Sequence, residues 1–187
     1  MNTKLNPYTI ADWDAMPADD GNRYEIIEGE LFVSCSPGLT HQRVFGNLFF
    51  EITSYLRANP IGEIVSTPGL ILSDVSGVIP DLVFFANEQR DSIITGERLT
   101  GPPALVIEIL SPGSGNIKRD QVAKLNLYAK HGVSKYWIVD PQNSTIERYV
   151  DDGSSLFLAE TLREEDSLVT AALPGFACQV SEIFRHF

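Results

Sequence analysis

The segment from Pro80 to Lys124 organises the chain, because it places acidic residues inside strongly apolar runs. The first run is Pro80-Asp81-Leu82-Val83-Phe84-Phe85, and the second is Ala104-Leu105-Val106-Ile107-Glu108-Ile109-Leu110. Both are short and nearly continuous in hydrophobicity, as expected of strands that are covered on both faces. An ionised carboxylate in such a strand is costly unless a cation or strong donors lie nearby, so Glu108 requires a partner.

Side chains point alternately to the two faces of a strand, so Asp81 shares a face with Val83, and Glu108 shares a face with Val106. If the two strands are neighbours in one sheet, both carboxylates can point to the same place near the strand ends. Two carboxylate oxygens, completed by a backbone carbonyl and water, form the hard-oxygen ligand set that Mg²⁺ or Mn²⁺ prefers. The segment therefore indicates a candidate metal site.

Length and composition favour one globular domain over residues 1–187. The chain is long enough for one well-formed core, and 43% hydrophobic with 21% charged residues is ordinary for a globular protein. No apolar run approaches the roughly 20 residues that span a membrane, and the N-terminus lacks the apolar core of a signal peptide. The two cysteines, Cys35 and Cys178, do not form a disulfide framework. We therefore expect a cytoplasmic protein with no membrane role.

The net charge of 14 − 25 = −11 bears on the possible partners. Proteins usually gain affinity for DNA by neutralising phosphates with Lys and Arg, so this balance counts against tight binding to nucleic acid. Acidic metal ligands offset part of that argument, because a bound divalent cation reverses their local field. Any DNA-binding surface must therefore be local, or be completed by a second copy of the chain.

The order of the predicted elements favours an α/β (α+β) fold, with a mixed central sheet flanked by helices and an N-terminal hairpin extension. Gly29 supplies the hairpin turn, and Thr40 caps a helix whose apolar residues recur at four-residue spacing. The expected elements are a short helix capped by Thr9, a hairpin over 24–35, a helix over 40–59, strands over 63–65, 69–72, 79–85 and 105–110, a helix over 116–131, and strands over 136–139 and 145–150. We expect a turn over 74–77 and a loop with one helical turn over 86–100.

An ordered set of motifs in the sequence resembles the Uma2 family, within the PD-(D/E)XK restriction-endonuclease-like superfamily. The resemblance covers most of the chain and depends on the set and its spacing, because a Pro-Asp pair alone is a weak signal. The matching segments are Arg23 to Leu31, His41, Pro80-Asp81, Gly101-Pro102-Pro103, Glu108 to Pro112, Asp120 to Lys124, Tyr128, and Tyr136 to Pro141. The resemblance implies a restriction-endonuclease-like core, Mg²⁺-dependent hydrolysis of DNA and, in many members, a homodimer.

The resemblance also implies roles for individual residues. Asp81, Glu108 and the carbonyl of Ile109 would surround the metal ion, which polarises the phosphate and lowers the pKa of a bound water. The superfamily usually has a lysine two residues after the glutamate, but that position here is Leu110. Lys124 fits a family variant with the lysine on the following helix, where it would orient the water or stabilise charge on the phosphoryl oxygens.

Each of these residues also has an explanation that involves no catalysis. Asp81 can end a turn that follows a proline, and Glu108 can form a structural ion pair with a basic residue that faces the core. Lys124 can form an i,i+4 pair with Asp120, worth at most about 0.5 kcal/mol on an exposed helix. Lys118 is a second candidate lysine in the same helix, but it lies outside the matching segment.

Three further residues are candidates for contact with the substrate. His41 is expected in the first turn of a helix, where it can touch a phosphate or serve local structure. Glu28 stands where many relatives have Asp, and it is either hairpin surface or an accessory acidic group. Tyr128 belongs to the predicted core and can border the site.

Three functions are therefore compatible with the sequence. The first is a Mg²⁺- or Mn²⁺-dependent endonuclease that acts on DNA. The second is a protein with the nuclease fold that binds a partner or nucleic acid without cutting it, which Leu110 and the acidic balance favour. The third is a metal-dependent hydrolase of another phosphate ester, which the lack of a basic stripe permits.

Overall fold

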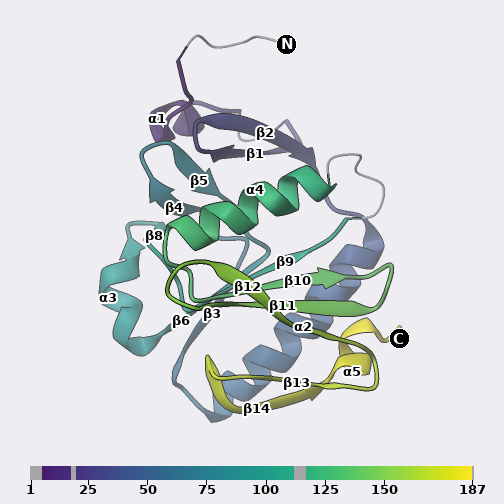
Figure 1. Cartoon of the computed structure of the whole chain (residues 1–187). Helices are drawn as coiled ribbons and strands as arrows, with labels where there is room; N and C mark the ends of the chain where they lie inside the picture. The colour runs from purple at the N-terminus through teal and green to yellow at the C-terminus, as the bar shows by residue number, and fades with distance from the viewer. Residues whose placement is uncertain (1–5, 18–19, 112–116, 187) are drawn as a thin grey trace.

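The computed structural model describes residues 6–17, 20–111 and 117–186, with the backbone alone for 117–120. Its strands form two six-stranded sheets and one two-stranded sheet within this part of the chain. Figure 1 shows helix α4 (Ile117–Lys130) between the two larger sheets, and helix α2 (Leu39–Ala58) on the opposite side of the lower one. No helix in the described ranges combines the length and the apolar character that crossing a membrane would require. The predicted mixed α+β class is confirmed.

The first six-stranded sheet has the order β2-β1-β5-β4-β8-β7. Its strands are β1 (Asn22–Ile27), β2 (Glu30–Cys35), β4 (Leu70–Ser73), β5 (Ser76–Val78), β7 (Ile94–Thr95) and β8 (Arg98–Thr100). The predicted hairpin is present as the antiparallel pair β1–β2. Its two turn residues, Glu28 and Gly29, have φ values of 50° and 78°, the left-handed backbone that a tight two-residue turn requires. The hairpin thus belongs to a larger sheet.

The second six-stranded sheet has the order β12-β11-β10-β9-β6-β3. Its strands are β3 (Gly62–Ser66), β6 (Leu82–Ala86), β9 (Leu105–Ile109), β10 (Lys135–Asp140), β11 (Thr145–Asp151) and β12 (Leu156–Leu162). Strand β9 runs parallel to β10 and antiparallel to β6, so the sheet is mixed, as predicted. Leu82 of β6 lies opposite Ile107 of β9. The two acid-bearing segments are therefore neighbours.

Side-chain alternation in this second sheet separates two cores. Leu105 and Ile107 belong to the cluster that includes the apolar stripe of α2, whereas Val106 belongs to the cluster that includes Tyr128 of α4. Because Glu108 has the same parity as Val106, its carboxylate lies on the α4 side of the sheet. The sheet thus presents one acidic strand position to the helix that carries the candidate lysine.

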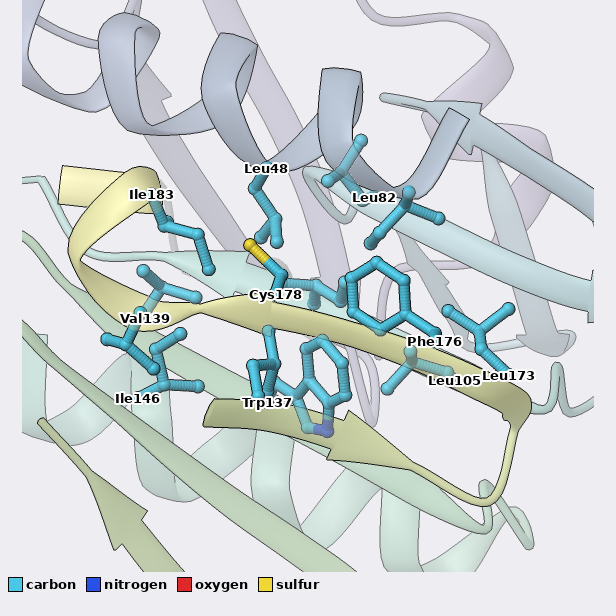
Figure 2. Close-up of a cluster of buried hydrophobic side chains, with 14 of the residues drawn as sticks. Leu48, Leu82, Leu105, Trp137, Val139, Ile146, Leu173, Phe176, Cys178 and Ile183 are labelled. Atoms are coloured by element: carbon cyan, nitrogen blue, oxygen red, sulfur yellow. The ribbon is translucent and has the colours of Figure 1, made fainter. Parts of the chain in front are cut away.

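The C-terminal segment closes the α2-facing core. It comprises β13 (Ser167–Thr170), the antiparallel β14 (Leu173–Gln179), and helix α5 (Val180–Phe184). Figure 2 shows Phe176 and Cys178 of β14 in one cluster with Trp137 of β10 and Leu48 of α2. This apolar layer covers the face of the central sheet opposite the one to which Glu108 points.

Helix α2 packs on the sheet through a stripe of buried residues at four-residue spacing, as predicted. These residues are Val44, Leu48, Ile52 and Leu56. The helix begins at Leu39 with Gly38 as its N-cap, so the prediction that Thr40 caps it is wrong. The Gln42 N–H donates to the Gly38 carbonyl at 3.1 Å, which places Thr40 inside the first turn. His41 is buried in that same turn.

Strand β6 begins at Leu82, three residues later than the predicted start at Ile79. Asp81 therefore lies immediately before the strand, and its carbonyl accepts a hydrogen bond from the N–H of Thr67 at 2.9 Å. Pro80 explains the later start, because a proline nitrogen cannot donate a ladder hydrogen bond.

Two segments expected to be turn and loop carry more regular structure than predicted. Strand β5 (Ser76–Val78) occupies the second half of the predicted 74–77 turn, and its Gly77 pairs with Ile26 of β1. A Cβ at Gly77 would lie 2.5 Å from the ring of Trp13 in α1 (Ile10–Asp14), so glycine permits this close packing. The 86–100 segment contains η1 (Asn87–Gln89), α3 (Arg90–Ile93), β7 and β8. Strand β8 pairs with the distant β4, and local sequence does not specify that pairing.

Thr67 provides a test of backbone strain next to Asp81. Its φ of 46° is unfavourable for a β-branched residue, whereas Asn tolerates this conformation. We expect Thr67→Asn to stabilise the protein by about 1 kcal/mol, which raises Tm by about 2–4 °C in thermal denaturation. Thr161→Asn in β12 is the control, because Asn is disfavoured in ordinary strand backbone. Equal or lower Tm in Thr67→Asn would contradict the strain.

Candidate functional site

Asp81 and Glu108 are both buried where β6 and β9 lie side by side. Their exposed fractions are 2% and 8%, which is unusual for acidic residues and requires compensation inside the protein. The N–H of Ile109, directly after Glu108, donates to Asp81 Oδ2 at 2.8 Å. This bond fixes the Asp81 carboxylate against the backbone of the strand that carries Glu108.

Two basic side chains complete the surroundings of Asp81. His41 Nε2 lies 3.0 Å from Oδ2, and Arg23 Nη1 lies 3.5 Å from Oδ1. Burial by itself raises the pKa of Asp81, but the hydrogen bond and charge of His41, with the Ile109 N–H and Arg23, outweigh it and hold the pKa below 3.8. Asp81 is therefore an ionised, firmly oriented carboxylate at neutral pH.

Glu108 meets the candidate lysine directly. Lys124 Nζ donates to Glu108 Oε1 at 2.9 Å, and the Tyr128 hydroxyl donates to the same oxygen at 2.9 Å. Lys124 Nζ also lies 2.9 Å from Glu25 Oε1 of β1, so one amine bridges two carboxylates from different sheets. The side chain of Lys124 therefore faces the sheet.

The pKa values in this cluster follow from burial and charge. Burial, together with the charges of Asp81 and Glu25, raises the pKa of Glu108 to about 7, although Lys124 opposes the shift. Burial lowers the pKa of Lys124, but the charges of Glu108 and Glu25 outweigh it and raise that pKa. Perturbed carboxylates next to a fixed cation mark a candidate functional site.

Strand β1 supplies two residues that the sequence analysis did not select. Arg23 and Glu25 alternate to the same face of β1 and contact Asp81 and Lys124 respectively. Glu25 also accepts a hydrogen bond from the Ile79 N–H at 2.8 Å. The sequence signal was weaker than for Glu108, because β1 begins with Asn22 and Arg23 and only Ile26 and Ile27 after Glu25 are apolar.

The structure brings together most of the predicted site residues, but Glu28 lies in a different cluster. Glu28 is 43% exposed in its side chain and forms an ion pair with Lys130 at the end of α4, and its Oε1 lies 3.6 Å from His131 Nε2. It also accepts a hydrogen bond from the Ser76 hydroxyl at 3.2 Å. His41 and Tyr128 lie in the cluster and contact the two acids rather than open solvent. The side chains of Lys118 and Asp120 lie outside the described residues.

Leu110 occupies the place where the superfamily usually has its lysine. Its N–H donates to the Val139 carbonyl at 2.8 Å, and its side chain packs against the cluster that contains Tyr128. The position is thus apolar, and Lys124 instead brings an amine to Glu108 from α4.

The donor set fits a hard divalent cation. In the cluster, the three carboxylates of Asp81, Glu108 and Glu25 outnumber the two permanent cations, Arg23 and Lys124. Within the described ranges, no group of three or more His, Cys, Asp or Glu side chains could hold a metal ion by itself. Two carboxylates with a backbone carbonyl and water would therefore have to complete the shell, and Mg²⁺ accepts that arrangement.

Comparison with known proteins identifies the family of the chain. The model of the Uma2 family, described as "Putative restriction endonuclease", matches residues 10–181. The chain belongs to the Uma2 family. No curated protein matches this Uma2 chain.

One solved structure shows the fold of this Uma2 protein. It comes from Anabaena variabilis and is described as a "putative nuclease belonging to DUF820". Its TM-score is 0.75 with 20% sequence identity, over 95% of this chain and 98% of that chain. The likeness confirms the predicted nuclease fold.

Proposed function

We propose that this Uma2 protein is a Mg²⁺-dependent endonuclease that hydrolyses phosphodiester bonds in DNA. Its family supports a nuclease function. The observation that carries the finer proposal is the Lys124 amine, which lies 2.9 Å from Glu108 Oε1. Glu108 is on β9, and Asp81 directly precedes the neighbouring strand β6. Two acids brought together by adjoining strands, with an amine in contact with one of them, are suited to metal-assisted hydrolysis of a phosphodiester.

In this proposal Asp81, Glu108 and the carbonyl of Ile109 hold the cation. A bound divalent ion supplies Lewis-acid polarisation of the phosphate and lowers the pKa of a coordinated water. Lys124 opposes the burial of Glu108 and so favours its ionised form, and the same amine can donate to a phosphoryl oxygen as negative charge develops. Ile109, through its N–H, keeps the Asp81 carboxylate oriented throughout.

Glu25 and His41 act in this proposal as positioning residues. Glu25 accepts a second hydrogen bond from the Lys124 amine, so two carboxylates hold the amine in place. His41 holds Asp81 Oδ2 together with the Ile109 N–H. Because these contacts exist before any ligand binds, little reorganisation is required when negative charge develops on the substrate.

The proposal extends to the partners of the protein. DNA is the substrate in this proposal. Because the protein has a net charge of −11, its affinity for DNA must arise from local cations such as Arg23 and Lys124. A homodimer would place a second set of such cations on the same duplex, and we propose a cytoplasmic location. Strong salt dependence of DNA binding follows, because the phosphate contacts release counterions.

Incubation of the protein with supercoiled plasmid and Mg²⁺ or Mn²⁺ tests the activity. We expect nicking by the wild type and none above background by Asp81→Asn, because the variant loses a charged ligand while it keeps the side-chain shape. Asp91→Asn, on the exposed surface of α3, is the matched control and should nick normally. Nicking that persists unchanged in Asp81→Asn, or that is absent from the wild type at high enzyme, would contradict the proposal.

The acidic balance of the chain favours a second candidate, a metal-dependent hydrolase of a smaller phosphate ester. Small phosphodiesters need no extended basic surface. A panel of nucleotides and synthetic phosphodiesters separates the two candidates, because turnover of these compounds without plasmid nicking would favour the second. Binding of DNA without turnover of any ester would instead favour a non-cutting member of the fold.

A further inference from the structure

A pocket of about 350 Å³ lies beside the acidic cluster, at the start of β1. Its walls come from Asn22 and Arg23, from Ser36-Pro37 before α2, and from Thr67 and Ile79. Arg23 belongs to both the pocket and the cluster, because its guanidinium contacts Asp81. Small-molecule sites begin at about 300 Å³, so this pocket can take one nucleotide-sized group.

The contacts of Arg23 are weak compared with those of its neighbours. Its Nη1 lies 3.5 Å from Asp81 Oδ1 and 3.4 Å from the Ile79 carbonyl, whereas the Ile109 N–H approaches Asp81 at 2.8 Å. Its side chain is 24% exposed, while that of Asp81 is 2% exposed. Arg23 can therefore turn toward a ligand in the pocket without breaking a short hydrogen bond.

The chemistry of the pocket wall suits a phosphate and its attached sugar. Arg23 is the charged residue of the lining, and Ser36 and Thr67 add hydroxyl groups. None of the described residues of the lining is acidic, although acids outnumber bases in the chain by 25 to 14. Asp20 lies two residues before Asn22 in the sequence, and its carboxylate oxygens accept hydrogen bonds from Asn22 and Tyr24.

We infer that this pocket binds the nucleotide adjacent to the scissile phosphate of a DNA strand, with the Arg23 guanidinium on that nucleotide's phosphate. The inference rests on the proposed nuclease function, and it names the part of the substrate that this region holds. Arg23 would be free to turn toward the pocket if Asp81 held a divalent cation, because such an ion would offset the negative charge that attracts the guanidinium. Planar guanidinium groups bind phosphate through paired hydrogen bonds, which a lysine cannot reproduce.

The pocket is also linked to Asp81, the candidate metal ligand, by a backbone hydrogen bond. Thr67 lines the pocket, and its N–H donates to the Asp81 carbonyl at 2.9 Å. Thr67 is thus linked to Asp81 through its backbone, and Arg23 is linked to Asp81 through its side chain. A nucleotide that contacts both residues would therefore hold its phosphate near Asp81.

Thymidine 3′,5′-bisphosphate tests the inference, because it carries phosphates on both sides of one nucleoside and contains no phosphodiester bond to cut. Calorimetric titration in Mg²⁺ should show binding by the wild type and a loss of affinity of about tenfold or more in Arg23→Gln. Arg23→Lys should lie between them. The matched control is Arg90→Gln, an exposed arginine paired with Glu63, and its affinity should stay within about twofold of the wild type.

Ser36→Trp provides a second variant that does not touch the acidic cluster. Ser36 is exposed, so the fold should tolerate the larger ring, which would fill the pocket and abolish binding of the bisphosphate. A short labelled oligodeoxynucleotide, measured by fluorescence anisotropy, shows whether the pocket serves a strand or only the free nucleotide. The Arg23→Gln variant should also lower the salt slope of oligonucleotide binding by about one.

Equal affinity for the bisphosphate in wild type and Arg23→Gln, or no binding by the wild type, would overturn the inference. Binding of the bisphosphate without Arg23-dependent binding of the oligonucleotide would also overturn it, because the site would then serve free nucleotides. Plasmid nicking that depends on Asp81 but not on Arg23 would leave the nuclease function intact while this inference fails. Arg23-dependent binding of both probes without nicking would support the pocket and count against the nuclease.

Discussion

Replacement of Lys124 by methionine should reduce both the nuclease activity and the stability of the protein. The Lys124 amine is the shared partner of Glu25 and Glu108, and its side chain is only 12% exposed. Without it, two buried carboxylates lose their cation, which typically costs about 3–5 kcal/mol of folding free energy. Loss of a donor aimed at developing charge typically lowers kcat by about 10²–10³-fold. Urea denaturation and plasmid nicking measure the two effects.

A second change separates the two roles of Lys124. Glu108→Gln in the Lys124→Met background should restore part of the stability, because it removes one of the orphaned charges, but it should not restore nicking. Lys130→Met is the control on the same helix, since Lys130 is 60% exposed and pairs with Glu28. Its stability should change by at most about 1 kcal/mol. A Lys124→Met protein as stable and active as the control would show that the buried amine has neither role.

Without divalent cations, the stability of the protein should fall as the pH rises from about 4.5 to about 7. The folded-state pKa of Glu108 is raised from 4.5 to about 7, mainly by burial, so the folded protein holds a proton in this window that the unfolded chain has released. Ionisation of Glu108 therefore destabilises the folded state, by about 3 kcal/mol when complete. The lowered pKa of Asp81 acts in the opposite direction and affects stability only as the pH falls below 3.8.

Denaturation curves at pH 5 and pH 8 measure this effect, and Glu108→Gln should flatten it because glutamine does not titrate. Mg²⁺ should raise Tm at pH 8 much more than at pH 5, since the cation binds a carboxylate rather than a carboxylic acid, and a chelator should reverse the gain. Glu63→Gln, a substitution at an exposed acid on β3, is the control and should leave the pH profile unchanged. A slope that survives in Glu108→Gln would assign the titration to another group.

The acidic pair could be predicted from sequence because its geometry depends on local rules. Alternation along a strand gives Glu108 the same face as Val106. The resemblance to the family places a lysine, Lys124, on the helix that follows. The structure agrees on both points, with Glu108 and Lys124 in direct contact. A burial argument was sufficient here, since a charge inside an apolar strand must find a partner.

The contribution of β1 could not be predicted in the same way. Arg23 and Glu25 reach the site because the sheet that contains the hairpin packs against α4, on the side of the helix away from the second sheet. Packing between such distant segments leaves no periodic pattern in the sequence. The same reason applies to β5, where Gly77 was expected in a turn but pairs with Ile26. Glu28 is a candidate through its family position, whereas Glu25, which contacts the candidate lysine, is buried.

The bond between Lys124 and Glu25 joins residues that are 99 positions apart in the chain. Contacts between such distant residues form slowly, because a long loop must close before the contact contributes energy. During refolding, the amine and its two carboxylates should therefore meet only after both sheets and α4 have associated. Recovery of enzymatic activity would then lag behind recovery of helical and strand content, and it would report the final assembly step of the molecule.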